Sequence, residues 1–291
     1  MNRWRDVTLE AADAYCAALL HHYENFTVAS RLAPRRLRPD LARVYAFCRY
    51  TDDLGDETGD PTVATRLLHR WRSDVGAVFH GATVAHPVLV ALSETISRHG
   101  LQEQPFLDLI EANLQDQYTS QYEDWTALRG YCRYSAAPVG RMVLQLFGVD
   151  PADAHAVALS DDVCIGLQLA NFAQDVSVDA RRGCTYVLQS DLREGGMRHA
   201  VESMCKRART LLVSGRELEG RVPRRLRPQL ALYRLGGNAI LDAIARIGFE
   251  TWKRRPAVSR GARAGIAMRA LRDVAVRPAP AATTAPVPSD G

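Results

Sequence analysis

The chain has 291 residues, 47% of them hydrophobic and 24% charged, which suits one large globular domain or two small ones. Its net charge of +4 is slight for this length and does not indicate a nucleic-acid partner. The six cysteines are scattered, without a CxxC pair, so they exclude a disulfide framework and indicate reduced thiols in a cytoplasmic protein.

Helical periodicity covers the N-terminal part of the chain, and Pro and Gly mark its breaks. Pro34 and Pro39 bracket a basic turn, after which Asp40 is expected to cap a helix that ends in an acidic stretch. Gly100 is a typical C-terminal stop. The helices predicted in this part cover 9–23, the segment from Asp40 to the acidic stretch, 62–80 and 86–99.

The rest of the chain continues in helices, and no segment shows the alternation typical of a strand, so we predict an all-α fold. Pro138 should kink or interrupt the apolar pattern over 125–148. The tail 275–291 is rich in Pro, Ala, Thr and Ser and is predicted to be disordered, which leaves 1–274 as one helical domain. The helices predicted in this part cover 106–122, 125–148, 151–179, 197–219, 226–253 and 260–273.

The helix after Asp40 ends in four carboxylates within six residues. Asp52 and Asp56 are four residues apart, as are Asp53 and Glu57, so each pair shares a helix face and repels by roughly 0.2–0.5 kcal/mol. A divalent cation such as magnesium would compensate this repulsion, because hard cations prefer carboxylate oxygen. The alternative is a solvated acidic helix end in which Asp53 pairs with Arg49.

A second acidic stretch ends the helix predicted over 151–179. Asn171, Asp175 and Asp179 recur every four residues and so share one face, with Gln168 one turn earlier. An unpaired carboxylate on an otherwise apolar helix is costly, which favours a ligand at this face. The alternative is a helix end that rises to solvent, with Asp179 paired to Arg182.

Two such helices in one helical chain are a more specific signal than either alone. Facing carboxylates could hold two or three magnesium ions, which would bind a diphosphate and act as Lewis acids when it leaves. Nearby arginines could add bidentate contacts to the diphosphate. The remaining apolar helix faces would line a pocket for a hydrocarbon chain and its carbocation.

Four ordered segments give the chain a resemblance to the squalene/phytoene synthases, which are all-helical enzymes of the isoprenoid synthase fold. The resemblance runs from about Tyr23 to about Pro256 and implies a single helical bundle around a central cavity. The segments are Asn25-Phe26 with Leu32-Ala33-Pro34, Tyr45-Ala46-Phe47-Cys48-Arg49 with Asp52 to Asp56, Tyr131 to Gly140, and Gln168 to Asp179 with Tyr186.

The resemblance also implies roles for individual residues. The magnesium and diphosphate ligands would be Asp52, Asp56, Asn171, Asp175 and Asp179. The catalytic residues would be the four aspartates of this set and Tyr45. The substrate-binding residues would be Asn25, Phe26, Arg49, Asp116, Val139, Gly140, Leu144, Gln168, Gln174 and Tyr186. Ordinary core packing is an equally good interpretation of Phe26, Tyr45 and Leu144.

At Asn25, Pro138 and Gln174 the chain resembles the bacterial hopanoid-associated squalene synthase C branch. Most of the family instead has Ser, Gly and Arg near these positions. The resemblance implies conversion of presqualene diphosphate to hydroxysqualene, through ionisation, rearrangement of a cyclopropylcarbinyl cation and quenching by water. Since no hydride is needed, we expect no nicotinamide cofactor. Gln174 either positions the water or has a structural role.

The chain departs from the family pattern Gly-Arg-x-Tyr-x-Pro, because Cys184 and Leu188 stand where Arg and Pro are usual. Arg181 or Arg182 would have to replace the missing cation near the diphosphate. A Tyr common near the end of the family's catalytic region is here Phe249.

Two alternatives to this reaction remain, and the departures at Cys184 and Leu188 favour only the second. One is head-to-head condensation of two farnesyl or geranylgeranyl diphosphates, giving presqualene diphosphate, squalene or phytoene. The other is a catalytically silent relative that acts as a binding or assembly protein. The intact acidic residues argue against a silent relative, which would have no evident reason to keep two self-repelling clusters.

An oily C30 product would favour peripheral contact with the inner membrane surface. The basic segments 35–38 and 224–227 could touch anionic lipids, although such runs are often simply solvated. The N-terminus lacks an apolar signal core, and no uncharged apolar run is long enough to span a bilayer, so we expect a cytoplasmic protein without a transmembrane helix.

Overall fold

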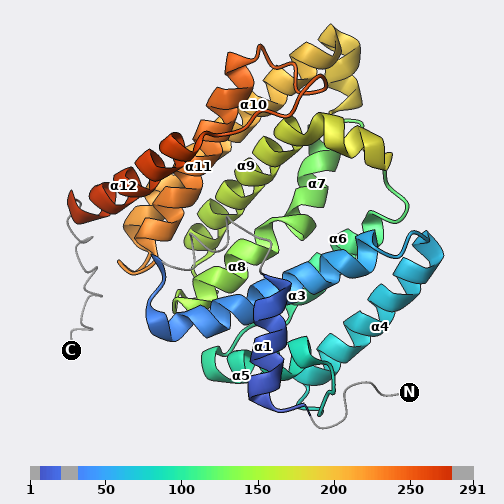
Figure 1. The fold of residues 1–291 in the computed structure, drawn as a ribbon, viewed down its shortest axis with the longest axis vertical. Helices are drawn as coiled ribbons and strands as arrows, with labels where there is room; N and C mark the ends of the chain where they lie inside the picture. The colour runs from blue at the N-terminus through green and yellow to red at the C-terminus, as the bar shows by residue number, and fades with distance from the viewer. Residues whose placement is uncertain (1–6, 21–31, 277–291) are drawn as a thin grey trace, which may run out of the picture.

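The computed structural model describes residues 7–20 and 32–276 and shows a bundle of α-helices (Figure 1). Within these residues the only β pairing is an isolated bridge between Gln121 and Thr185. The predicted all-α fold class is therefore confirmed. Asn25, Phe26 and the residues from 277 onward lie outside the described part of the chain, so the expectations for them stay predictions.

The N-terminal helices begin and end at the signals that the sequence supplies. Asp60 accepts a hydrogen bond from the Thr62 amide at 2.8 Å where α4 begins, which satisfies a backbone donor left open by the helix. α5 ends at Gly100, whose φ of 61° is left-handed and costs glycine little. The elements are α1 (Leu9–Leu19), η1 (Arg35–Leu37), α3 (Arg38–Asp56), α4 (Pro61–Phe79) and α5 (Pro87–His99).

The second part of the chain forms longer helices. α10 contains a break at Gly195 and Gly196, so the helix predicted from residue 197 is its second arm. The elements are α6 (Gln104–Gln115), α7 (Trp125–Ser135), α8 (Ala137–Leu146), α9 (Ala154–Asp179), η2 (Ala180–Arg182), α10 (Gln189–Arg221), α11 (Arg227–Arg246) and α12 (Arg260–Val276).

Several predicted boundaries were wrong. The helix expected over 106–122 ends at Gln115, and residues 120–122 are instead extended and pair with a distant segment. The interruption expected near Pro138 is confirmed, because α7 and α8 meet at a break at Ala136. α12 continues to Val276, three residues beyond the end predicted for this helix. Asp40 lies within the first turn of α3 and caps nothing.

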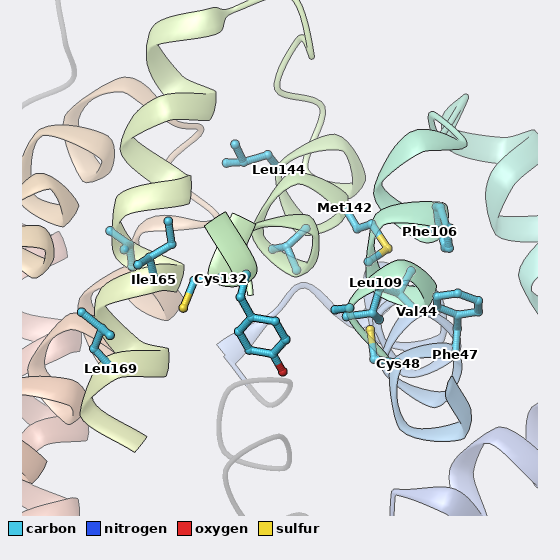
Figure 2. Packing of buried hydrophobic residues seen from close by; sticks show 14 of the residues in the cluster. Val44, Phe47, Cys48, Phe106, Leu109, Cys132, Met142, Leu144, Ile165 and Leu169 are labelled. Carbon is cyan, nitrogen blue, oxygen red and sulfur yellow. The ribbon is translucent and has the colours of Figure 1, made fainter. Parts of the chain in front are cut away.

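Helix α9 runs through the middle of the bundle, with α10 and α11 on one side and α7 and α8 on the other (Figure 1). Gly166 allows the close approach to α10, because a Cβ there would lie 3.1 Å from the Ala208 carbonyl oxygen. Ile165 and Leu169 of α9 are buried, and Val44, Phe47 and Phe106 form a second part of the same core around α3 and α6 (Figure 2). The central helix thus carries its acidic face out of the core.

The segment 154–182, which includes α9, is long and apolar enough to cross a membrane by length and composition, and it is the only such segment in the described part of the chain. Just over half of its most apolar window, 56%, is buried within the protein. Packing on four neighbouring helices accounts for that hydrophobicity, so it needs no lipid to explain it.

Candidate active site

The C-terminal end of α3 holds Asp52 against α6. Asn113 Nδ2 donates to Asp52 Oδ1 at 3.3 Å. Gly55 permits the close approach of the two helices, because a Cβ there would lie 2.9 Å from Asn113 Oδ1. Burial, assisted by the charge of Asp56, raises the pKa of Asp52 to about 7 although the Asn113 hydrogen bond lowers it. The charge of Arg49 lowers this pKa too, but not enough to return it to its usual value, so the carboxylate is only partly compensated.

Asp116 follows α6 directly and has one unsatisfied oxygen. Tyr131 on α7 donates its hydroxyl to Asp116 Oδ2 at 2.9 Å. Asp116 Oδ1 is buried and has no hydrogen-bond partner among the described residues. Burial, with the charges of Asp56 and Asp52, raises the pKa of Asp116 to about 7 although the Tyr131 hydrogen bond lowers it. An unmade hydrogen bond of this kind costs about 1–3 kcal/mol, which is reason to look for a ligand.

Three stacked aromatic side chains, Tyr131, Phe172 and Tyr186, lie beside Asp116. The Thr185 amide donates to the Ser120 carbonyl at 2.8 Å, which holds the segment after η2 against the segment before α7. This pairing brings Tyr186 onto Phe172 of α9, with ring centroids 3.8 Å apart and planes 7° from parallel. Tyr131 lies 5.8 Å from Tyr186 by the same measure. Stacked π faces therefore adjoin the acidic residues.

Cys184 lies just after α9, and its amide donates to the Asp179 carbonyl at 3.1 Å. Burial raises the pKa of its thiol, and the charges of Asp116, Asp179 and Asp56 raise it further. The position where the family usually has an arginine is thus within reach of these negative charges. Arg182, three residues after Asp179, pairs with Asp56, so the C-terminal ends of α9 and α3 lie near each other. That their carboxylates face each other around metal ions stays a prediction.

The acidic face of α9 is partly compensated. Arg255 contacts both oxygens of Asp175, with Nη2 3.1 Å from Oδ2. Burial, with the charge of Asp175, raises the pKa of Asp179 to about 6 although Arg182 and Arg255 lower it. Asn171 is exposed one turn before Asp175.

The sequence suggested ion pairs of Arg49 with Asp53 and of Arg182 with Asp179, and the structure forms only the first. Arg49 Nη2 lies 2.6 Å from Asp53 Oδ1 and 3.2 Å from Glu57 Oε1, so the pairing weighed as an alternative for Asp53 is present. The contact between Arg49 and a diphosphate stays a prediction. Arg182 Nη1 is 3.8 Å from Asp56 Oδ2, so Arg182 pairs across to α3, and the pairing with Asp179 weighed from the sequence is not formed. One of the two proposed replacements for the missing family arginine is therefore at the site.

The donors suit a hard cation but are not drawn together around one. Within the described ranges no three His, Cys, Asp or Glu side chains are close enough to hold a metal ion by themselves. The unsatisfied oxygen of Asp116 and the raised pKa values of Asp52 and Asp179 nevertheless fit a site that positive charge completes. Carboxylate and amide oxygens are also the ligands that magnesium prefers.

Comparison with known proteins identifies the family of the chain. The family model for squalene/phytoene synthase matches residues 19–262. The chain belongs to the squalene/phytoene synthase family. The members of this family process prenyl diphosphates, and the predicted family and isoprenoid synthase fold are confirmed.

Individual relatives sharpen the likeness. A squalene synthase HpnC from Alicyclobacillus acidocaldarius is 44% identical, with a TM-score of 0.76 over 84% of this chain and 97% of that one. A hydroxysqualene synthase from Zymomonas mobilis is 34% identical over 199 residues, or 66% of this chain and 65% of the relative. Phytoene synthase 3 from Zea mays is 33% identical over 67% of this chain, which spans only 47% of that protein. A dehydrosqualene synthase with a TM-score of 0.83 is 23% identical and shows the fold alone.

The residues of this family member predicted to line a hydrocarbon pocket differ in their surroundings. Leu144 is buried in the core, as its alternative interpretation held. Gly140 lies where α8 meets α9, since a Cβ there would be 2.5 Å from Ser160 Oγ and 2.6 Å from Cys164 Sγ. Its evident role is helix packing. Val139 is half-buried beside it.

Tyr45 has a polar partner that the sequence did not reveal. Its hydroxyl lies 3.1 Å from the hydroxyl of Tyr233 on α11, and both side chains are half-buried. Burial holds the pKa of Tyr45 well above its usual value, so the phenol stays neutral. α3 and α11 therefore present a pair of hydrogen-bonded hydroxyls between them.

Gln174 has a structural contact. Its side chain is buried, and Nε2 donates to the Pro256 carbonyl at 2.7 Å, which ties α9 to the segment before α12. The structural role weighed for this residue is thus present, whereas a role in positioning water stays a prediction. Gln168 is half-buried one turn before Asn171 on α9.

Sequence reasoning missed several residues that shape the site. Asn113, Tyr131 and Arg255 contact Asp52, Asp116 and Asp175 respectively. Tyr131 lies in one of the segments that carried the resemblance, but neither Asn113 nor Arg255 belongs to a recognisable pattern. Only the fold brings them to the carboxylates.

Proposed function

We propose that this protein ionises presqualene diphosphate and lets water quench the rearranged cation, giving hydroxysqualene. The observation that carries the proposal is the ion pair of Arg182 with Asp56, which joins the acidic ends of α9 and α3 beside stacked aromatic rings. The likeness to a squalene synthase HpnC and to a hydroxysqualene synthase supports this reaction among those of the family.

Magnesium is part of the proposal. The residues that would hold two or three ions are Asp52, Asp56, Asn171, Asp175 and Asp179. When bound, the ions supply Lewis-acid stabilisation to the leaving diphosphate. Arg182 and Arg49 lie at the edge of the same cluster, where a guanidinium can donate to diphosphate oxygens.

Aromatic side chains of the protein would stabilise the carbocation. The faces of Tyr131, Tyr186 and Phe172 lie beside the acidic cluster, and π faces attract positive charge. Tyr45, paired with Tyr233, contributes neutral hydroxyls that can orient a single water without supplying a base.

Product identification tests the proposal directly. The purified protein is incubated with presqualene diphosphate and magnesium, with and without a nicotinamide cofactor. We expect hydroxysqualene in both reactions. Squalene formed only with the cofactor, or no turnover of presqualene diphosphate, would contradict the proposal.

Head-to-head condensation is the second candidate, because phytoene synthases are also among the relatives. Farnesyl and geranylgeranyl diphosphate supplied separately would then be consumed to presqualene diphosphate, squalene or phytoene. A silent relative is the remaining alternative. It predicts no metal-dependent binding of a diphosphate analogue, which a calorimetric titration measures.

We further propose a cytoplasmic protein that contacts the inner membrane surface. The basic runs first considered for this are partly engaged elsewhere, since Arg225 donates to the Phe147 carbonyl at 2.6 Å and Arg227 is buried. α12 offers exposed Met268 and Leu271 flanked by arginines, a combination that suits an anionic lipid surface. Flotation with anionic and neutral vesicles tests this, and only the anionic vesicles should retain the protein.

A further inference from the structure

An arginine from the C-terminal part of the chain occupies the acidic face of α9. Arg255 Nε and Nη2 contact the two oxygens of Asp175 in a bidentate pair. The neighbouring residues are also in contact, because Gln174 Nε2 donates to the Pro256 carbonyl at 2.7 Å. Two adjacent contacts therefore fasten residues 255–256 to the part of α9 that carries the predicted metal ligands.

The backbone after α11 is shaped to bring Arg255 there. Gly248 and Phe249 have φ values of 67° and 64°, so the chain reverses in two consecutive left-handed residues. Phe249 adopts this conformation at a cost that glycine would avoid. Thr251 is fully buried behind the turn. The position of Arg255 is thus fixed by the fold and does not depend on its own ion pair alone.

The ion pair is nevertheless easy to break. The Arg255 side chain is 54% exposed and that of Asp175 is 25% exposed, and exposed pairs contribute at most about 1 kcal/mol. A divalent cation with several carboxylate ligands can displace such a pair. By contrast, Arg234 and Glu219 form a pair with exposures of 6% and 3%, whose loss would leave a buried charge.

We propose that Arg255 is a positioning residue, an internal cation that holds Asp175 in place and leaves it when a metal ion binds. The inference rests on the proposed metal cluster and adds to it a competitor built into the chain. Arg255 also lowers the pKa of Asp179, so its charge acts on both carboxylates of the α9 face. Residues 254–256 would become less tightly held to α9 as the ion enters, while the turn at Gly248 and Phe249 stays in place.

Metal binding without substrate tests the competition. Mn²⁺ is the probe, because carboxylate sites accept it and electron paramagnetic resonance counts the free ion. The full-length protein is compared with Arg255→Gln, Arg255→Lys and Arg254→Gln. Arg254 is the exposed neighbour in the same segment, so its variant removes the same charge without touching the ion pair.

Arg255→Gln should bind Mn²⁺ about two- to fivefold more tightly than the wild type, which corresponds to roughly 0.4–1 kcal/mol. Arg255→Lys should lie between them, because lysine keeps the charge but not the bidentate contact. Arg254→Gln should match the wild type.

Two results would overturn the inference, and they differ. Equal Mn²⁺ affinity in Arg255→Gln and Arg254→Gln, or a weaker affinity in the former, rejects the competition but leaves the metal cluster standing. No Mn²⁺ binding in any variant rejects the metal cluster and the competition together. Hydrogen exchange of residues 250–256 gives a second readout, since protection in the wild type should fall when Mn²⁺ is added.

Discussion

Helix α3 carries acidic side chains at both ends, and the two ends are built differently. At the N-terminal end Asp40 is fully buried and accepts hydrogen bonds from Arg43, Thr95 and Arg98, with His99 Nε2 3.0 Å from Oδ2. At the C-terminal end Asp52 has Asn113 as its neutral donor, and neighbouring Asp116 keeps one oxygen without a partner among the described residues.

The difference separates structural from functional carboxylates. Around Asp40 the protein itself provides both the charge and the hydrogen bonds that burial requires. Around Asp52 and Asp116 it provides too little of either, and the pKa of both is raised to about 7. Burial alone therefore does not mark a ligand site, whereas burial with incomplete compensation does.

The N-terminal end should show the largest effect, on stability. Asp40→Asn leaves the buried Arg43 with one carboxylate partner fewer, and we expect a loss of about 3–5 kcal/mol in the free energy of unfolding. Denaturant unfolding measures this. Thr95→Val, which removes one neutral donor to Asp40, is the milder control and should cost about 1 kcal/mol. A stable Asp40→Asn protein would remove the basis of the comparison.

A substitution near the C-terminal end of α3 should change the activity of the protein and not its stability. Asp116→Asn keeps the shape of the side chain but removes its charge, and we expect turnover of presqualene diphosphate to fall by at least about 100-fold. Because the raised pKa means that the ionised carboxyl opposes folding above pH 7, the variant should be as stable as the wild type at pH 8, or more stable. Unchanged turnover with lost stability would assign Asp116 a structural role like that of Asp40.

His86 extends the comparison to a half-buried base. It packs against the rings of Tyr50 and Trp71, with centroids 4.3 Å and 5.0 Å away, and burial lowers its pKa to about 4. An unfolded chain has a value near 6.5, so its contribution to stability is complete above pH 6.5 and is lost as pH falls toward 4. Between pH 7 and 4.5 the wild type should lose about 1–2 kcal/mol more than His86→Phe. Parallel unfolding curves for the two proteins would contradict this.

Gln174 should give the smallest effect, because its partner is a single backbone carbonyl. Gln174→Leu removes the hydrogen bond to Pro256 and should cost about 1 kcal/mol of stability. We expect the same product from presqualene diphosphate as from the wild type, by mass spectrometry. A switch from an alcohol to a hydrocarbon product would instead support a role for Gln174 in positioning water.

The sequence by itself determined the helices and their polar faces. Local signals such as Asp60 and Gly100 act within a few residues, so the ends that depend on them were predictable. The spacing of Asp52 with Asp56, and of Asp175 with Asp179, placed each pair on one face for the same reason. Residues 120–122 were wrongly predicted to be helical, because they pair with a segment more than 60 residues away in the chain, and this pairing overrides their helical periodicity.

Only the tertiary structure decided which carboxylates are compensated. Asn113 reaches Asp52 across 61 residues, and Arg255 reaches Asp175 across 80. Asp40 and Asp116 look alike in the sequence, as single acidic residues in or beside helices. Their environments differ because solvation and charge compensation depend on every group within a few ångströms, and the chain order does not specify those neighbours.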